Sequence, residues 1–251
     1  MSSSGCPDRF TRTVDLYGDA GFASIRAARV VVCGLGGVGA HAALALARSG
    51  IGRLVLIDFD PVTASSLNRS PCATIADVGR PKVTVVGDFL RHTCPDTGVE
   101  GVEAFFHTDT AEALLAPPPS CVVDAIDALN PKVELLTACV ARGIPVASSM
   151  GAAGRTDVSF VRAGDLWESR RCPLAGRVRK YLRRRGVTAP IPCVWSEEEP
   201  ADALAPDADD PRYERGRIRN RLPSGIAMPG IFGYALASLV LDLVAGRTAG
   251  D

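Results

Sequence analysis

Short runs of consecutive apolar residues alternate with longer segments of mixed polarity along the first 150 residues. The apolar runs are 29–33, 53–57, 121–125 and 145–149. Such runs are typical of parallel strands that are covered on both faces. The intervening segments predict helices at 41–49, 82–92 and 131–142, and a further strand at 99–105. This βαβ alternation predicts an α/β fold, a Rossmann-like doubly wound and largely parallel sheet, over about residues 28–150.

The pattern changes after residue 150 and predicts an additional C-terminal portion of strands and helices in the same domain, which would span residues 1–251. This portion contains predicted strands at 158–162 and 224–228 and predicted helices at 174–185 and 231–245. One further short helix is predicted at 19–28, before the first strand of the sheet. We expect residues 1–8 to be a flexible tail. Residues 197–210 carry seven acidic and no basic side chains, so 197–215 is predicted to be a flexible surface loop.

The segment 231–245 is the most apolar of the predicted helices. A membrane-spanning helix needs about 20 apolar residues. This run is shorter, follows Pro229-Gly230 and contains Asp242. We therefore expect a helix packed in the core or at a dimer interface, and no stable membrane span.

Composition narrows the functional classes. Lys plus Arg and Asp plus Glu both number 28, so no global field attracts nucleic acid or anionic lipid, and such a site must be a local patch. With 47% hydrophobic residues the chain can form a sizeable core. The eight cysteines include no CxxC pair, and no secretory signal is evident at the start of the sequence. These features predict free thiols in a reducing cytoplasm.

A glycine motif, GxGxxG, lies directly between a predicted strand and a predicted helix. Its glycines are Gly34, Gly36, Gly37 and Gly39. Glycine permits the tight turn and the close approach of a phosphate to backbone N–H groups at a helix N-terminus. Asp58 ends the next predicted strand, where a carboxylate can reach a ribose hydroxyl. The motif therefore predicts a nucleotide site, although a tight turn without ligand and a nicotinamide dehydrogenase share these features.

Further polar residues favour a triphosphate over a nicotinamide. Asn68 and Arg69 follow the second predicted strand, Lys82 begins the next helix, and Asp127 follows the strand at 121–125. Arg and Lys neutralise phosphate oxygens, and a carboxylate at this edge of the sheet can hold Mg²⁺. Each residue alone could be a solvated charge or a helix cap, but together they indicate that these side chains surround one nucleotide-binding crevice.

Several segments resemble the adenylating E1-like superfamily, which includes the ThiF and MoeB proteins. They are RFTRTVDLYG at 9–18, VVCGLGGVGAHAALALARSGIGRLVLIDFD at 31–60, LNRS at 67–70, GRPK at 79–82 and VVDAID at 122–127. The segments 172–187, 192–200 and 224–238 resemble its tRNA threonylcarbamoyladenosine dehydratase branch. The resemblance covers residues 6–246, and the zinc-binding CxxC pairs of the sulfur-carrier activators are missing.

The resemblance implies roles for individual residues. Asp58 matches the ribose-binding acid, Gly37 the glycine against the nucleotide, and Asp127 the Mg²⁺-associated acid. Arg12 matches an arginine that reaches into the partner subunit's ATP site. The implied catalytic residues are Arg69, Lys82, Asp127 and Arg12. The implied ATP-binding residues are Gly34, Gly36, Gly37, Gly39, Asp58, Asp60, Asn68, Arg69, Lys82 and Asp127. ATP and Mg²⁺ are the expected cofactors, and the resemblance also admits a monovalent cation.

Three positions depart from the superfamily pattern. Ser66 stands where Asn is usual, and Ser70 where Gln is common. Both departures bear on the geometry around the phosphates. The stretch 151–158 lacks the usual Asp-Pro ending, which bears on any monovalent-cation or substrate loop there.

The resemblance implies ATP-dependent cyclodehydration of N6-threonylcarbamoyladenosine in tRNA through an acyl-adenylate. Two alternatives remain: adenylation of a ubiquitin-like or sulfur-carrier protein C-terminus, and a non-catalytic nucleotide-binding scaffold in sulfur transfer. A homodimer is expected, and a cysteine desulfurase or sulfur-acceptor system is a further partner that the resemblance admits. No cysteine is required for this chemistry, and Cys193 is interpreted as a small buried side chain.

The expected tRNA contacts are basic side chains in the second half of the chain, because Lys and Arg pair with backbone phosphates. The first group lies on the helix predicted at 174–185 and comprises Arg177, Arg179, Lys180, Arg183, Arg184 and Arg185. The second group comprises Arg212, Arg215, Arg217, Arg219 and Arg221. The alternative is a solvated face balanced by the acidic stretch at 197–210.

Overall fold

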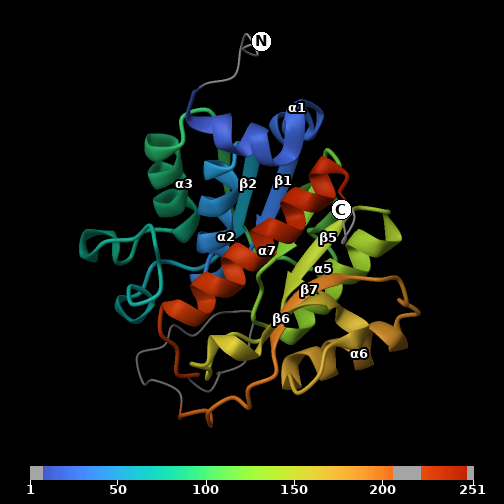
Figure 1. The fold of residues 1–251 in the computed structure, drawn as a ribbon. Helices are drawn as coiled ribbons and strands as arrows, with labels where there is room; N and C mark the ends of the chain where they lie inside the picture. Colours follow the sequence, from blue (N-terminus) through green and yellow to red (C-terminus); the bar gives the residue numbers. More distant parts are fainter. Residues whose placement is uncertain (1–7, 206–221, 248–251) are drawn as a thin grey trace.

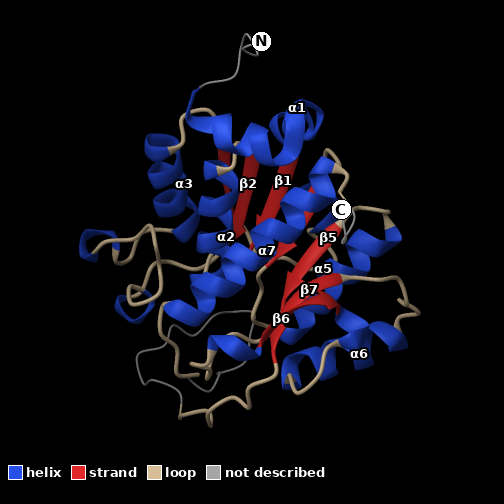
Figure 2. Ribbon diagram, in the orientation of Figure 1, coloured by secondary structure: helices blue, strands red, loops and turns tan. Residues whose placement is uncertain are grey.

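A twisted seven-stranded sheet forms the centre of the molecule in the computed structural model, which describes residues 8–205 and 222–247 (Figures 1 and 2). The strands are β1 (Arg29–Cys33), β2 (Arg53–Asp58), β3 (Gly98–Glu103), β4 (Cys121–Asp124), β5 (Val146–Ser149), β6 (Val161–Asp165) and β7 (Pro192–Ser196). Their order is β3-β2-β1-β4-β5-β7-β6, and every neighbouring pair is parallel except β6 and β7. The predicted fold class is therefore confirmed.

Helices cover both faces of this sheet. They are α1 (Thr11–Ala27), α2 (Gly37–Arg48), α3 (Lys82–Thr93), α4 (Ala111–Leu114), α5 (Leu129–Ala141), α6 (Pro173–Arg184) and α7 (Ala227–Ala245). Apolar side chains of α1, α2, α3 and α7 share one core with one face of the sheet. Those of α4, α5 and α6 share the other core with the opposite face.

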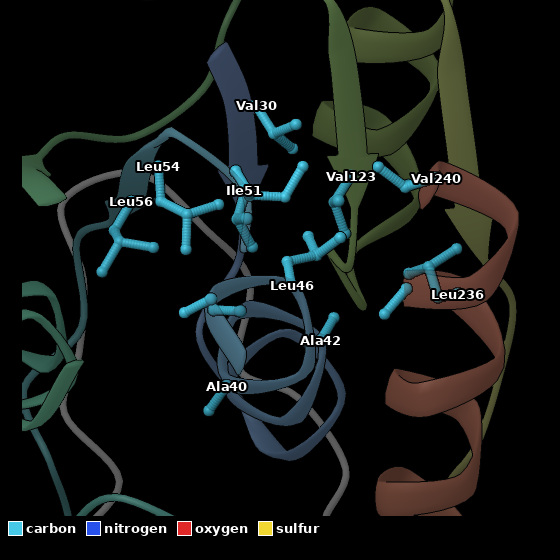
Figure 3. Packing of buried hydrophobic residues seen from close by; sticks show 14 of the residues in the cluster. Val30, Ala40, Ala42, Leu46, Ile51, Leu54, Leu56, Val123, Leu236 and Val240 are labelled. Carbon is cyan, nitrogen blue, oxygen red and sulfur yellow. The ribbon is translucent and has the colours of Figure 1, made fainter. Parts of the chain in front are cut away.

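Strand residues alternate between these two cores, as the pleat of a strand requires. Val30 and Val32 belong to one core, while Val31 and Cys33 belong to the other. Figure 3 shows the first core, where Leu46 and its neighbours on α2 and α7 lie against the strands. Both faces of β1 are buried, which explains why its sequence is continuously apolar.

The apolar helix α7 crosses one face of the sheet beside α2 (Figure 1). Its side chains Phe232, Leu236 and Val240 are fully buried in the core. By length and composition alone α7 could cross a membrane, but half of its most apolar window is buried in this fold. The expectation of a packed core helix is confirmed by these contacts.

Most element boundaries differ from the sequence prediction by a few residues, and four differences are larger or change the kind of element. The helix expected at 19–28 begins at Thr11, and a backbone break at Gly18 (φ 70°) separates its two parts. The strand expected at 158–162 begins at Val161, because 158–160 forms a 3-10 turn capped by the Asp157 side chain. The strand expected at 224–228 is wrong, since α7 already begins at Ala227. Asp8 of the expected tail lies in a 3-10 helix.

The C-terminal portion adds its strands to the same sheet, because β7 pairs with β5 and carries β6 on its outer edge. Residues 197–203 have no regular secondary structure. Most of the loop predicted at 197–215 falls outside the described residues.

Candidate nucleotide-binding site

The glycine loop joins the end of β1 to the start of α2 at the carboxyl edge of the sheet. Strand order reverses here, because β1 has β2 on one side and β4 on the other, and ligands of such sheets bind at this switch point. Gly34 has φ +89°, and a Cβ there would lie 2.8 Å from Ala125 O. A Cβ on Gly39 would lie 1.8 Å from Gly34 O. Both glycines are therefore required by backbone packing.

The middle glycines have different surroundings. Gly36 is exposed, and a Cβ there would meet nothing within 4 Å, so this position leaves room for a ligand. Gly37 is buried, and a Cβ there would lie 2.8 Å from Pro229 Cβ and 3.2 Å from Arg69 Cγ. The absent side chain of Gly37 thus admits Pro229 of α7 and the stem of Arg69.

Asp58 ends β2 beside the glycine loop and is buried. Its Oδ2 accepts a hydrogen bond from Leu35 N at 2.6 Å, and its Oδ1 accepts one from Asp60 N at 2.8 Å. Burial raises the pKa of the Asp58 carboxyl above its ordinary value, and the Lys82 ammonium opposes that shift. The carboxylate therefore connects the glycine loop to the end of β2.

Lys82 begins α3 and is held against the β2 end by short-range contacts. Pro61 and Pro81 form a β-bridge, and Lys82 N donates to Asp60 O at 3.0 Å. The Lys82 Nζ atom lies 2.8 Å from Asp60 Oδ2 and 3.9 Å from Asp58 Oδ1. Asp60 Oδ1 is buried with no hydrogen-bond partner among the described residues. Lys82 is thus held between two carboxylates at the end of β2.

Arg69 and Asn68 lie on the loop after β2. Arg69 Nη1 donates to Ser65 O at 2.7 Å and to Asn68 Oδ1 at 3.1 Å. Asn68 Nδ2 donates to Ser224 O at 2.8 Å, a contact that ties this loop to the segment before α7. Burial lowers the pKa of Arg69, and the Asp127 carboxylate opposes that shift. Arg69 and Asp127 are therefore close enough to interact.

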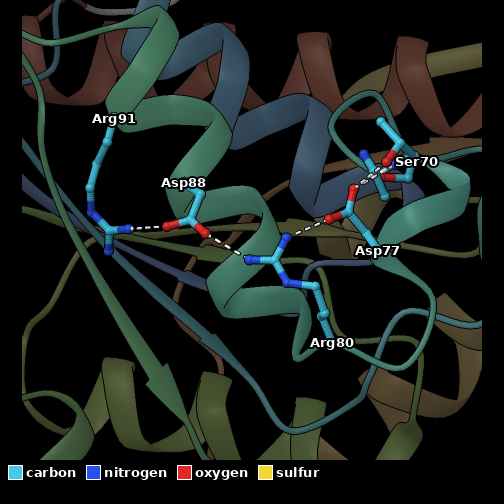
Figure 4. A network of polar contacts seen from close by, with 7 residues as sticks. Ser70, Asp77, Arg80, Asp88 and Arg91 are labelled. Atoms are coloured by element: carbon cyan, nitrogen blue, oxygen red, sulfur yellow. Dashed lines mark hydrogen bonds and ion pairs between the residues drawn. The ribbon is translucent and has the colours of Figure 1, made fainter.

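Charged side chains order the segment between Arg69 and Lys82 (Figure 4). Arg80 pairs with Asp77 at 2.5 Å and with Asp88 at 2.9 Å, and Asp88 also pairs with Arg91. Exposed ion pairs contribute little singly, but a chain of them restricts the loop that they span. This network fixes the path of the chain between the two basic residues of the site.

The two serine departures both stabilise the backbone of this loop. Ser66 Oγ accepts from Thr63 N at 3.0 Å and donates to Thr63 O at 2.7 Å. Ser70 Oγ accepts from Ala73 N at 3.2 Å. These short side chains close local turns and leave the hollow beside them to a ligand.

One hollow connects the predicted phosphate-binding residues. It is lined by Leu35, Gly36 and Gly37 of the glycine loop, by Arg69 and Ser70, and by Lys82. Asp127 is exposed at the turn after β4. No three His, Cys, Asp or Glu side chains form a metal-binding group within residues 8–205 and 222–247. A single exposed carboxylate fits Mg²⁺, which keeps several waters and binds mainly through substrate phosphates.

The comparisons with known proteins agree with this arrangement. The family model described as the ThiF family matches residues 10–250, nearly the whole chain. The chain belongs to the ThiF family. As a member of the ThiF family, the chain is similar to the tRNA threonylcarbamoyladenosine dehydratase of Bacillus subtilis, with 32% identity over 240 residues and 94% of each chain covered. It is 36% identical over 232 residues to tRNA threonylcarbamoyladenosine dehydratase 2 of Saccharomyces cerevisiae, covering 87% of this chain and only 52% of that longer protein.

A solved ThiF-family relative gives the same result for the fold. The crystal structure of E. coli tRNA N6-threonylcarbamoyladenosine dehydratase in complex with ATP matches with a TM-score of 0.83 at 30% identity. The match covers 95% of this chain and 94% of that chain. Both halves of the ThiF-family chain, including the C-terminal portion, therefore have counterparts in the E. coli enzyme.

Arg12 lies away from the other site residues in the ThiF-family fold. It is exposed on α1 and lines a cavity of about 320 Å³ with Tyr17, Tyr234 and Leu241, on the outer surface of α1 and α7. The nucleotide loop contributes nothing to this lining. Within one chain, Arg69 and Lys82 line the same hollow and Asp127 lies near Arg69, whereas Arg12 lines a separate cavity.

The basic residues of α6 fall into two kinds. Arg179 is half-buried, and its Nη1 donates to Ser169 O at 2.8 Å, so its contacts are structural. The others are exposed and have no ion pair with the described carboxylates: Arg177, Lys180, Arg183, Arg184 and Arg185. Arg170 and Arg171 extend this exposed basic surface before the helix. The second predicted group, Arg212 to Arg221, lies outside the described residues.

The described acids of the 197–210 stretch do not balance α6. Glu197 lies 3.8 Å from Arg162, and the Glu198 carboxylate accepts hydrogen bonds from the backbone of Thr156 and Asp157. Arg155 is buried beside them, with Nε donating to Glu198 O at 2.9 Å and Nη1 donating to Gly151 O. The Arg155 guanidinium therefore places a positive charge within the stretch 151–158, where the resemblance admits a monovalent cation.

The cysteine side chains of residues 8–205 and 222–247 are all buried as free thiols. Burial raises the pKa of the Cys193 thiol to about 12, and it raises the pKa values of Cys72, Cys121 and Cys139 to about 12 as well. Since the thiolate is the nucleophilic form, these environments disfavour covalent catalysis. The interpretation of Cys193 as a small buried side chain agrees with its zero exposure.

Sequence reasoning missed a buried ion pair behind the site. Lys132 of α5 and Asp124 of β4 have no exposed side-chain surface and lie 2.6 Å apart. The available indication was a lysine in the first turn of the predicted helix at 131–142, eight residues after the aspartate at the end of the preceding strand.

Proposed function

We propose that this protein uses ATP to cyclise N6-threonylcarbamoyladenosine in tRNA through an acyl-adenylate. The observation that carries the proposal is the near full-length similarity to dehydratases, in a fold where Arg69 and Lys82 line one hollow with the glycine loop and Asp127 lies near Arg69. The catalytic requirement is charge neutralisation around a triphosphate, which these residues can meet. We further propose that the residues from Gly34 to Gly39, Asp58, Asp60 and Asn68 complete the ATP site.

In the first step the threonyl carboxylate oxygen attacks the α-phosphorus and pyrophosphate leaves. Arg69 and Lys82 would bind the phosphate oxygens, for which Lys82 must exchange its 2.8 Å contact with Asp60 for a phosphate. Asp58 would accept from the ribose hydroxyls. Mg²⁺, when bound, neutralises phosphate charge, and Asp127 would hold it.

In the second step the carbamoyl group attacks the activated carbonyl carbon and gives up one N–H proton to water, and AMP leaves with the former carboxylate oxygen. This ring closure is intramolecular, so positioning supplies much of the rate and no protein nucleophile is needed. The buried described cysteines agree with that route.

We propose that tRNA docks on the exposed basic surface of α6. Its supporting features are five exposed basic side chains and the neighbouring Arg170 and Arg171. Two guanidinium groups lie over aromatic rings, with Arg183 5.1 Å from Trp167 and Arg184 5.4 Å from Tyr181. Stacked arginine and aromatic groups suit both phosphates and unpaired bases. Arg179 is removed from the predicted contact set because the α6 fold already uses its donors.

We also propose a homodimer in which Arg12 of one subunit completes the ATP site of the other. The position of Arg12, remote from the hollow of its own chain, supports an action across an interface. A cytoplasmic location and a sulfur-transfer partner remain our expectations for the protein.

The deciding experiment supplies purified protein and ATP with either N6-threonylcarbamoyladenosine-containing tRNA or a sulfur-carrier protein. We expect AMP and pyrophosphate with the tRNA, and mass spectrometry of the digested tRNA should show the modified nucleoside lighter by one water. Release of pyrophosphate and formation of an adenylated carrier, with the tRNA unchanged, would support the protein-adenylation alternative. ATP binding without release of pyrophosphate in the presence of either substrate would support the scaffold.

A further inference from the structure

A fully buried lysine lies beneath the carboxyl edge of β4 and β5, where the mechanism above does not use it. The Lys132 Nζ atom lies 2.6 Å from Asp124 Oδ2, 2.8 Å from Ser149 O and 3.4 Å from Ser148 Oγ. Lysine has three N–H donors, so these three oxygens satisfy the ammonium completely. The group joins α5 to the ends of two adjacent strands.

Asp124 links this lysine to the turn that carries Asp127. Its Oδ2 accepts from Lys132 and from Ser148 Oγ at 2.6 Å, while its Oδ1 accepts from Ile126 N at 3.1 Å. The carboxylate therefore has one oxygen anchored in the core and the other defining the turn from 124 to 127.

The same turn supports the glycine loop. Ala125 N donates to Cys33 O at 2.9 Å. A Cβ on Gly34 would lie 2.8 Å from Ala125 O, and one on Gly39 would lie 3.1 Å from Ala125 Cβ. Because the turn and the loop approach this closely, a shift of the turn would displace the glycine loop as well as Asp127.

A buried ion pair is a costly way to stabilise a core, because desolvation of both charges offsets their attraction and apolar residues often serve as well. The contacts of this pair converge on one turn beside the site. We infer that Lys132, acting through Asp124, is a positioning residue that sets Asp127 and the glycine loop for binding of ATP and for adenylation. The part of this inference that concerns adenylation rests on the proposed function, and the part that concerns ATP binding does not.

Two adjacent serines of β5 provide a matched test. Ser148 and Ser149 are both buried, but only the Ser148 hydroxyl contacts Asp124, while the Ser149 hydroxyl donates to Met150 O. Ser148→Ala should weaken ATP binding in the presence of Mg²⁺ by roughly fivefold, the scale of a single buried hydrogen bond. Ser149→Ala should lower the melting temperature by a similar amount but leave the ATP affinity unchanged.

Calorimetric ATP titrations with and without Mg²⁺, run beside thermal unfolding, measure both effects. Equal ATP affinities in the two variants would overturn the positioning role, because a purely structural pair predicts effects that follow stability. If Ser148→Ala does not fold, hydrogen exchange of the wild-type Ile126 amide decides. Slow exchange like that of β4 supports the inference, and rapid exchange contradicts it.

A paired replacement tests the ion pair itself. Asp124→Leu combined with Lys132→Met removes both charges and should retain the fold, but it leaves Ile126 N without its acceptor. Asp124→Asn with Lys132→Met keeps an acceptor at that position. We expect kcat for AMP formation to fall at least tenfold in the first double variant and to recover in part in the second. If wild-type protein forms no AMP with tRNA, the proposed function fails, while the ATP titrations still test this inference.

Discussion

Asp58 combines two requirements at one buried carboxyl. It must remain ionised to accept hydrogen bonds from Leu35 N and Asp60 N, although burial opposes ionisation. Lys82 compensates part of that cost. We propose the same lysine as a phosphate ligand, so a change at Asp58 would also alter the electrostatics of the proposed phosphate contact.

Asp58→Asn should change the pH dependence of stability in a defined direction. Burial raises the folded-state pKa of Asp58, so above pH of about 4 the folded protein holds more proton than the unfolded chain, and this group lowers stability as pH rises. The stability of Asp58→Asn relative to wild type should therefore increase from pH 4 towards pH 7. Urea unfolding across this range measures the difference, and parallel curves would contradict the shift. ATP affinity should fall in the same variant.

Asp127→Asn should reduce AMP formation by roughly 100-fold, the scale for removing one group that stabilises transition-state charge. The fold should survive, since the Asp127 side chain is exposed. Quenched-flow or steady-state AMP assays measure the decrease, with Glu112→Gln on the exposed surface of α4 as control. Near-normal turnover would show that this carboxylate is not needed for catalysis.

At the scale of elements, α6 has one apolar face and one basic face. Ala175, Val178 and Leu182 are buried in the core, and the arginines between them are therefore directed outward except Arg179. Helical periodicity explains this separation, because residues three and four apart share a face.

Reversing Arg183 and Arg184 to Glu should weaken tRNA binding strongly and leave ATP affinity nearly unchanged. The double reversal of Arg48 and Arg142, which are exposed at or directly after the ends of other helices, changes net charge equally and is the control. Filter binding over a salt series should show the slope of log affinity against log salt reduced by about 0.7–0.9 for each phosphate that the helix no longer neutralises. An unchanged slope would exclude α6 as the docking surface.

At the scale of the whole molecule, the C-terminal segment contacts the glycine loop and the loop after β2. Ser224 O accepts from Asn68, Pro223 O accepts from Gly154 N, and Pro229 lies against Gly37. Two of these contacts join α7 or the segment before it to the first third of the chain. The site is therefore built by both halves of the chain.

Mixing two inactive variants tests the proposed action of Arg12 across a dimer. Arg12→Ala and Lys82→Ala should each form little AMP alone. A mixed dimer would contain one site with both an intact Lys82 and an intact Arg12 from its partner, so part of the activity should return. Labelled subunits must first demonstrate exchange by native mass spectrometry. Exchange without recovery would rule against a trans arginine.

The sequence pattern predicts the central parallel strands, the glycine loop and the residue types around that loop. Continuous apolar runs such as 29–33 predict buried parallel strands because both faces need apolar side chains. Asp58, Arg69 and Lys82 follow strand ends or begin helices, so the topology alone directs them to one edge.

Which side chains contact one another depends on the tertiary structure. The Lys132–Asp124 pair, the Lys82–Asp60 pair and the inward Arg179 depend on distances across elements, which local patterns do not encode. The same holds for the segment at 224–228, where tertiary contacts of α7 replace an expected strand. The hydrophobic periodicity of a sequence indicates which side chains are buried. Which side chain each of them contacts depends on how elements that are distant in the sequence pack together.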